Sequence, residues 1–140
     1  MALTLFAFDT PNARKITVAL EEMGLTYAVQ VVDITQKEQF DAEFLKISPN
    51  NKIPALVDTE GQDGQTQTVF ESGAILIYLA EKTGKFLPAK GAGRVAALEW
   101  LMFQMGGFGP APGQVHHYAA LSNEADKRYG FERFMSETLR

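Results

Sequence analysis

The chain of 140 residues contains no cysteine. It can therefore form neither a disulfide nor a thiolate metal site, and it has no cysteine nucleophile of its own. Any thiol chemistry must come from a ligand. Positive charge is also scarce, because 13 Lys and Arg stand against 17 Asp and Glu and leave a net charge of −4. A broad attraction to nucleic acid or to an anionic membrane requires a basic face, so neither is expected as a partner.

Long hydrophobic runs are missing as well. No stretch approaches the roughly 18 apolar residues that a membrane-spanning helix needs. Residues 1–8 are apolar, but no basic residues precede them and no small-residue cleavage pattern follows, so they do not form a signal peptide pattern. A chain with 46% hydrophobic and 21% charged residues has the balance of an ordinary folded protein. We therefore expect a soluble, cytoplasmic protein.

The first 84 residues alternate between strand and helix patterns. Apolar residues at helical spacing predict helices that begin at residue 11, near residue 39 and near residue 71. Short apolar or alternating runs predict strands at 3–8, 27–33, 53–57 and 67–70. The resulting order, β-α-β-α-β-β-α, predicts an α/β domain with a mixed sheet flanked by helices.

The second part of the chain has no strand pattern. Residues 85–93 are rich in Pro, Gly and Ala and predict a linker. Residues 94–105 have helical spacing, the Gly- and Pro-rich run at 106–113 is expected to bend or end that helix, and 131–139 predicts another helix. The expected domains are therefore 1–84, an α/β domain, and 94–140, an all-helical region.

Two predicted helix starts carry side chains suited to a charged ligand. Ser72 is the expected cap of its helix, where its hydroxyl and the free N–H groups suit a carboxylate, while Glu71 suits an ammonium group. Thr10 and Asn12 stand at the start of the first helix and could orient a thiolate, whose pKa a helix N-terminus lowers. Taken singly, Glu71 and Ser72 are better explained as a surface acid beside an ordinary helix cap, and Thr10–Asn12 is a common capping sequence.

Pro54 follows a polar turn and opens a strand, which makes the Ile53–Pro54 bond a candidate cis bond. A cis bond would leave the N–H and C=O of Ile53 facing outward, free to pair with an extended peptide. The alternative is a trans proline at a strand edge, which is the commoner form.

No metal site is expected. The adjacent residues His116 and His117 would point about 100° apart on a helix and could not chelate one ion well. A surface or interface role suits them better.

Taken together, the motifs resemble those of the glutathione transferases, which join a thioredoxin-like N-terminal domain to an all-helical one. The resemblance is closest to the bacterial Nu-class branch, whose members are similar to disulfide-bond oxidoreductases. Its motifs stand here as Thr-Pro-Asn at 10–12, Ser-Pro-Asn-Asn-Lys-Ile-Pro-Ala at 48–55 and Phe-Glu-Ser-Gly-Ala-Ile-Leu at 70–76. One match alone would be weak, whereas three in the right order and spacing are a strong signal. Further matches between Trp100 and His117 extend the resemblance over essentially the whole chain.

The resemblance implies a binding site for glutathione. Glu71 and Ser72 would hold the γ-glutamyl ammonium and carboxylate groups. Ile53, before a cis Pro54, would pair its backbone with the cysteinyl unit.

The resemblance also assigns roles to the remaining candidate residues. Thr10 and Asn12 would face the sulfur and act as the catalytic residues. Asn51 and Lys52 would lie along the tripeptide, with Lys52 near the glycyl carboxylate, and Arg133 matches by position an arginine that approaches glutathione.

The function implied is that of a glutathione transferase with disulfide-reductase activity, which uses glutathione as substrate and no metal. A bound glutathione thiolate would attack a substrate disulfide, and a second glutathione would resolve the mixed disulfide. The same thiolate could instead be conjugated to an electrophile. The partners would be glutathione or glutathione disulfide together with that second substrate. The alternative is a binding or regulatory protein that keeps the scaffold without turnover, but the intact set of Thr10, Asn12, Glu71 and Ser72 favours an enzyme.

Members of the resembled family extend their helical domain well past residue 140. We therefore expect residues 94–140 to be only the beginning of that domain. An exposed apolar face on Leu98, Leu101 and Met105 would then favour dimerisation or aggregation, and we expect a homodimer.

Overall fold

The computed structural model describes residues 2–61 and 63–139 of the chain, which divide into two compact units, Met1–Ala89 and Lys90–Arg140. Among the residues described, no helix has both the length and the apolar character that crossing a bilayer requires.

The first unit is built on a four-stranded mixed sheet with the order β2-β1-β3-β4. Its strands are β1 (Leu3–Ala7), β2 (Tyr27–Val31), β3 (Ala55–Asp58) and β4 (Gln67–Phe70). β1 runs parallel to β2 and antiparallel to β3, which in turn pairs antiparallel with β4. The predicted mixed sheet and element order are confirmed. β3 begins two residues later than predicted, since Ile53 and Pro54 precede it in the loop.

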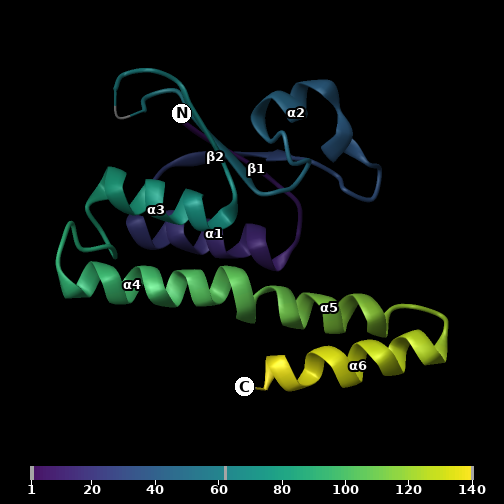
Figure 1. The fold of residues 1–140 in the computed structure, drawn as a ribbon. Coiled ribbons are helices and arrows are strands. Elements are labelled where there is room, and N and C mark those ends of the chain that lie inside the picture. The colour runs from purple at the N-terminus through teal and green to yellow at the C-terminus, as the bar shows by residue number, and fades with distance from the viewer. Residues whose placement is uncertain (1, 62, 140) are drawn as a thin grey trace. The chain divides into compact units, whose positions relative to one another are not determined.

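Helices cover both faces of this sheet (Figure 1). α1 (Pro11–Met23) and α3 (Ser72–Thr83) lie side by side on one face, and α2 (Ala42–Ile47), after a short 3-10 turn η1 (Glu38–Phe40), lies on the other. Alternate strand residues point to each face, as a pleated strand requires. The face toward α1 and α3 holds the main core, whose fully buried side chains are Leu5, Ile16, Leu20, Leu56, Ile75 and Leu79.

The second unit consists of helices: α4 (Ala92–Phe103), the π-helical turn η2 (Gln104–Phe108), α5 (Pro110–Ala119) and α6 (Glu124–Thr138). The Gly- and Pro-rich run was expected to bend or end the helix, but helical structure continues through it. The N–H of Gly109 donates to the carbonyl of Gln104 at 2.7 Å, across five residues instead of four. Because Pro110 has no N–H to continue the ladder, the helix widens by one residue before α5 begins.

α6 begins at Glu124, well before the predicted start at residue 131. Asn123 caps it, since its side-chain oxygen accepts hydrogen bonds from the N–H groups of Ala125 at 2.8 Å and Asp126 at 3.3 Å. An Asn followed by acidic residues is a helix-start signal that the apolar spacing alone did not reveal. α6 packs against α5 at Gly130, where a Cβ would lie 2.1 Å from Cβ of Tyr118. Only glycine allows that approach.

The exposed apolar residues of α4 differ from those predicted. Leu98, Leu101 and Met105 are partly buried. Trp100 and Phe103 are exposed instead, by 71% and 54%, and their rings contact edge-to-face at a centroid distance of 5.7 Å. The prediction named the wrong face of the helix. It assumed that the apolar face formed by the leucines and the methionine at helical spacing would have no element packed against it.

Candidate functional site

The strand register brings the three sequence motifs to one end of the sheet. Phe6 of β1 pairs with Ala55 of β3, and Ala55 pairs with Phe70 of β4. Pro54 therefore enters β3 at the end where β1 and β4 leave the sheet, and the chain segments that start α1 and α3 follow directly. We refer to it as the Pro54 end of the sheet, and to the opposite end, where β3 finishes, as the Asp58 end.

At the start of α1, Thr10 is the N-cap, and its hydroxyl oxygen accepts a hydrogen bond from the N–H of Ala13 at 3.4 Å. Asn12 lies in the first turn of the helix with an exposed side chain. The carboxylate of Asp9 is engaged by Arg14 through two hydrogen bonds of 2.7 and 3.0 Å, which together with the charge of Arg14 lower the pKa of Asp9. Arg14 therefore neutralises the acid nearest this helix start, and the positive end of the helix dipole remains available to an anion.

The loop before β3 is held by its own hydrogen bonds. The buried hydroxyl of Ser48 donates to the carbonyl of Lys52 at 2.8 Å, and the N–H of Asn51 donates to the carbonyl of Ser48 at 2.9 Å. Asn51 has a φ of +49°, and the Ile53–Pro54 bond is cis, as the family resemblance implied. Within the described residues, neither the N–H nor the C=O of Ile53 has a hydrogen-bond partner. This backbone can therefore accept an extended ligand.

At the start of α3, the structure corrects one prediction: the N-cap is Glu71, and Ser72 is the first helical residue. The reason is the backbone of Glu71, whose φ of +70° turns the chain directly from β4 into the helix. The side chain of Ser72 is therefore buried, with only 4% exposed, at the first turn. The N–H groups of a first helical turn have no acceptor within the helix, so this position still suits a carboxylate.

The carboxylate of Glu71 is reached by two groups that the sequence patterns did not single out. The side-chain amide of Asn50 donates to Oε1 of Glu71 at 3.5 Å. Lys15, partly buried on α1, feels the charge of the same carboxylate: burial lowers the pKa of Lys15, and the attraction of Glu71 opposes that shift. Two signals were present in the sequence, since Lys15 follows Asn12 by one helical turn and Asn50 lies inside the second motif.

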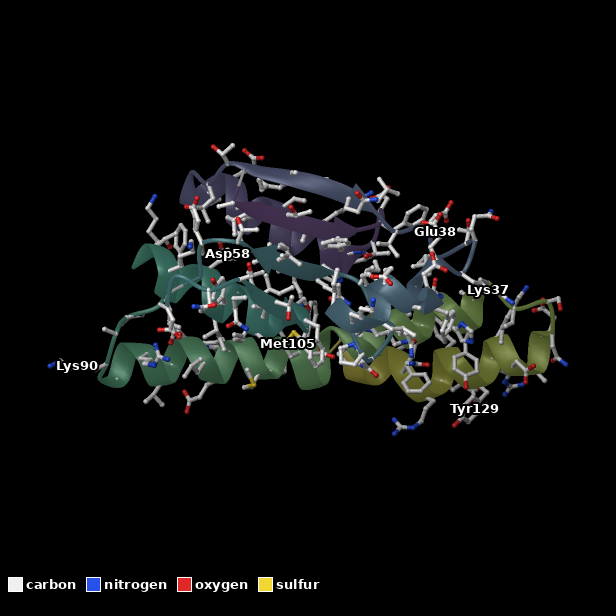
Figure 2. All side chains as sticks on the ribbon, turned by 90° about the horizontal axis from the view of Figure 1, so that it is seen from above. Lys37, Glu38, Asp58, Lys90, Met105 and Tyr129 are labelled. Atoms are coloured by element: carbon white, nitrogen blue, oxygen red, sulfur yellow. The ribbon has the colours of Figure 1, made fainter. Side chains whose placement is uncertain are left out.

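The Asp58 end carries a polar cluster around the side chain of Asp58, which is labelled in Figure 2. The fully buried carboxylate of Asp58 accepts hydrogen bonds from the hydroxyl of Tyr78 at 2.7 Å and the N–H of Glu60 at 2.9 Å, and pairs with the ammonium of Lys82 at 2.7 Å. Burial by itself raises the pKa of Asp58, but the hydrogen bonds from Lys82, Tyr78 and Glu60 outweigh it, so that the net pKa is lowered. Burial and the neighbouring carboxylate raise the pKa of Tyr78. Because all of these groups satisfy one another, this cluster stabilises the fold.

Two further predictions concern Arg133 and metal binding. Arg133 is on α6 in the second unit, where its guanidinium lies over the ring of Phe134, 5.3 Å from the centroid. Its role in ligand binding stays a prediction. Among the described residues, no group of at least three His, Asp or Glu could hold a metal ion.

Comparison with known proteins places these features in a family. Residues 1–81 match the family described as glutathione S-transferase, N-terminal domain. The disulfide-bond oxidoreductase YfcG of Escherichia coli (strain K12) is 49% identical over 139 residues, which cover 99% of this chain and 64% of that protein.

Two solved structures are similar over 97% of this chain and 60% of theirs. A glutathione transferase family member from Pseudomonas fluorescens Pf-5, with two glutathione bound, has a TM-score of 0.92 and 44% identity. A glutathione transferase from Pseudomonas putida, with one glutathione disulfide bound per subunit, has a TM-score of 0.87 and 42% identity.

The family match extends over more than half of the chain, and the similar structure from P. fluorescens, a glutathione transferase family member, matches 97% of it. The chain spans 64% of the length of the E. coli relative. The thioredoxin-like fold and the resemblance inferred from the three motifs are confirmed, and the chain belongs to the glutathione S-transferase family.

Proposed function

We propose that this chain binds glutathione at the Pro54 end of the sheet and activates its thiol. The observation that carries the proposal is the convergence there of a helix start at Thr10, an unpaired peptide backbone at Ile53 and an acid beside a second helix start at Ser72. Glutathione offers a matching series: a thiol, an extended peptide, and an amino-acid head group with both charges. The relatives with glutathione or its disulfide bound support the same assignment.

In this proposal the head group of glutathione binds between Glu71 and the start of α3. The carboxylate of Glu71 receives the ammonium group, and Ser72 with the first N–H groups of α3 receives the carboxylate. The backbone of Ile53 pairs with the cysteinyl unit as a short added strand. Asn51 and Lys52 lie along the rest of the tripeptide, with the ammonium of Lys52 near the glycyl carboxylate.

The thiol of the bound glutathione lies in this arrangement at the start of α1. Thr10 and Asn12 donate hydrogen bonds to its sulfur, which together with the helix dipole favour the thiolate over the thiol. Because this chain contains no cysteine, the reacting thiolate must be that of a bound ligand.

We propose disulfide reduction as the reaction. The bound thiolate attacks one sulfur of a substrate disulfide, so that a glutathione mixed disulfide forms and the other sulfur leaves as a thiolate. A second glutathione thiolate then attacks the glutathione sulfur of that mixed disulfide, which releases the remaining substrate thiolate and glutathione disulfide. Two glutathione molecules are oxidised for each disulfide reduced. The name of the E. coli relative, a disulfide-bond oxidoreductase, favours this reaction over conjugation to an electrophile.

Binding is tested by titration calorimetry with glutathione, at millimolar concentrations, on the wild type and two variants. Because Ser72→Ala removes a hydrogen bond to a charged group, we expect it to weaken binding by about 10-fold or more. The control, Gln67→Ala, removes an exposed amide whose one recorded hydrogen bond, of 3.0 Å, goes to the carbonyl of Thr68. It should bind as the wild type does. A wild type that neither binds glutathione nor gains thermal stability from it contradicts the proposal.

Catalysis is tested by glutathione-dependent reduction of 2-hydroxyethyl disulfide, with conjugation to 1-chloro-2,4-dinitrobenzene measured beside it. We expect turnover of the disulfide and a loss of about 10-fold or more in Asn12→Ala, since one donor to the thiolate is removed. Binding without turnover of either substrate would identify a non-catalytic scaffold. Equal rates for the wild type and Asn12→Ala would remove Asn12 from the mechanism.

The remaining assignments belong to the same proposal. The glutathione-binding domain is residues 1–84, and the linker, predicted as 85–93, ends where α4 starts at Ala92. Residues 94–140 belong to an all-helical domain, and Arg133 of that domain is a proposed ligand contact. We propose that the protein is a homodimer, because Trp100 and Phe103 expose apolar surface that a second copy could cover. The cytoplasm is its proposed location. Light scattering after size exclusion would show a mass of one chain if the dimer is wrong.

A further inference from the structure

Glu71 combines an unusual backbone with an exposed side chain. Its φ of +70° places it in the left-handed region, which non-glycine residues rarely occupy and which costs on the order of 1 kcal/mol or more. The side chain itself is exposed. A glutamate on the surface normally samples several rotamers, and ordering such a side chain opposes binding. A carboxylate expected to recognise one ammonium group therefore needs something to hold it.

Asn50 is placed to do this. Its amide nitrogen lies 3.5 Å from Oε1 of Glu71, although the two residues are 21 positions apart in the chain. The loop that carries Asn50 is itself fixed, because Ser48 is buried and bonds to the carbonyl of Lys52 on the far side of the turn. An amide is a neutral donor, so it orients the carboxylate and leaves its charge available. The 3.5 Å distance is long, and hydrogen bonds in ligand-free sites commonly shorten when the ligand binds.

The surrounding charges fit this arrangement. The carboxylate of Glu71 attracts the positive charge of Lys15 on α1, which opposes the lowering of the Lys15 pKa by burial. If the ammonium group of Lys15 alone held Glu71, it would compete with the ammonium group of the ligand for the same carboxylate. A neutral amide on the loop side avoids that competition, and it contacts only Oε1 of the carboxylate.

We propose that Asn50 is a positioning residue, whose amide holds the Glu71 carboxylate in the orientation that receives the α-ammonium group of a γ-glutamyl peptide. The inference rests on the proposed function, since it concerns the ammonium pole of the same site. It assigns Asn50 no contact with the ligand. Its effect on binding must therefore pass through Glu71 and through the ammonium group alone.

The test is a double-mutant cycle measured by titration calorimetry. Four proteins are compared: wild type, Asn50→Ala, Glu71→Ala and the double variant. Each is titrated with glutathione and with glutaryl-cysteinyl-glycine, the analogue that lacks only the α-amino group. We expect Asn50→Ala to weaken glutathione binding about 3- to 10-fold, the range of one hydrogen bond, and to leave the binding of the analogue unchanged. In the Glu71→Ala background, the same substitution should change glutathione binding less than 2-fold.

Two further variants and one control measurement keep the result interpretable. Asn50→Ser removes the amide but keeps a short polar side chain, and it should reproduce the loss seen with Asn50→Ala. Gln67→Ala, an exposed amide at the other end of β4, should change neither affinity. Melting temperatures are measured for all variants. If Asn50 had a structural role, replacing it would lower the melting temperature and weaken the binding of both ligands equally.

The outcomes separate the two proposals. A wild type that binds neither glutathione nor the analogue contradicts the proposed function. A wild type that binds both equally tightly keeps glutathione binding but overturns the ammonium pole at Glu71 and with it the role of Asn50. A wild type that discriminates between the ligands while Asn50→Ala binds glutathione equally well overturns the role of Asn50. An equal loss for both ligands, or the same loss with and without Glu71, also overturns it.

Discussion

The two ends of strand β3 differ in how their polar groups are satisfied. At the Asp58 end, one carboxylate is fully buried and takes its hydrogen bonds and its counter-charge from the protein itself. At the Pro54 end, the backbone of Ile53 has no partner among the described residues, and Asn51 and Glu71 hold positive φ angles. A single strand therefore has one end built for stability and one end that keeps groups available for a ligand.

This difference has a physical basis. A buried charge without partners costs several kcal/mol, so the fold is stable only if the protein itself supplies the partners of the Asp58 carboxylate. Polar groups exposed to water carry no such cost, because water can hydrogen-bond to them until a ligand binds. Backbone strain and unpaired groups are accordingly found at functional sites more often than elsewhere. The following predictions test the contrast, from the largest effect on stability to the smallest.

The largest effect should come from Asp58→Ala. The substitution leaves the hydroxyl of Tyr78 and the ammonium of Lys82 without the carboxylate that both of them contact. We expect a loss of about 3 kcal/mol in the free energy of unfolding, measured by urea denaturation. Asp63→Ala, at an exposed acid in the β3–β4 loop, is the control and should change stability by less than about 0.5 kcal/mol. Equal effects of the two substitutions would remove the distinction between buried and exposed acids.

Acid should lower the free energy of unfolding by protonating Asp58. The pKa of Asp58 in the folded protein is lowered from its ordinary value of 3.8, so its contribution to stability is fully present above that value. As the pH falls below about 4, the unfolded chain binds the proton first and the contribution is lost progressively down to the folded pKa. The acid limb of a stability profile should therefore be shallower in Asp58→Asn than in the wild type. A wild-type slope retained in that variant would assign the acid sensitivity to other carboxylates.

Thr10→Ala probes the Pro54 end with a smaller effect. Thr10 caps α1 through one hydrogen bond of 3.4 Å, so its loss should cost about 0.5–1 kcal/mol, at the low end for helix caps. Asn12→Ala, in the same turn, should leave the urea midpoint nearly unchanged while it lowers turnover. If Asn12→Ala destabilises the fold as much as Thr10→Ala does, the side chains of this end serve structure as well as ligand.

Glu71→Gly should change stability no more than Thr10→Ala does. Glycine relieves the strain of the φ of +70°, but it also raises the conformational entropy of the unfolded chain, and the two effects oppose each other. The free energy of unfolding should therefore shift by less than about 1 kcal/mol. Glutathione affinity, measured in the same preparation, should fall about 10-fold or more because the ammonium group loses its carboxylate. A large loss of stability would show that Glu71 supports the fold directly.

Several parts of the fold could be predicted because they depend on local patterns. The helix start at Thr10 and Pro11 followed from capping chemistry, and the helix end at Gly24 from a left-handed φ of +71° that glycine tolerates. The element order followed from strands and helices of ordinary spacing. The predictions were less accurate where neighbouring turns interact: the N-cap of α3 lies on Glu71, and the helix continues through the Gly- and Pro-rich run at 106–113.

The sequence by itself determined that this chain lacks a thiol of its own, that it builds a mixed sheet with three helices, and that three motifs of a glutathione transferase occur in order. Only the tertiary structure decided which side chains meet. Strand register places Pro54 beside the ends of β1 and β4, and the loop before β3 brings Asn50 to Glu71 across 21 positions of the chain. Contacts between residues far apart in sequence depend on how the whole sheet closes, which no local pattern encodes.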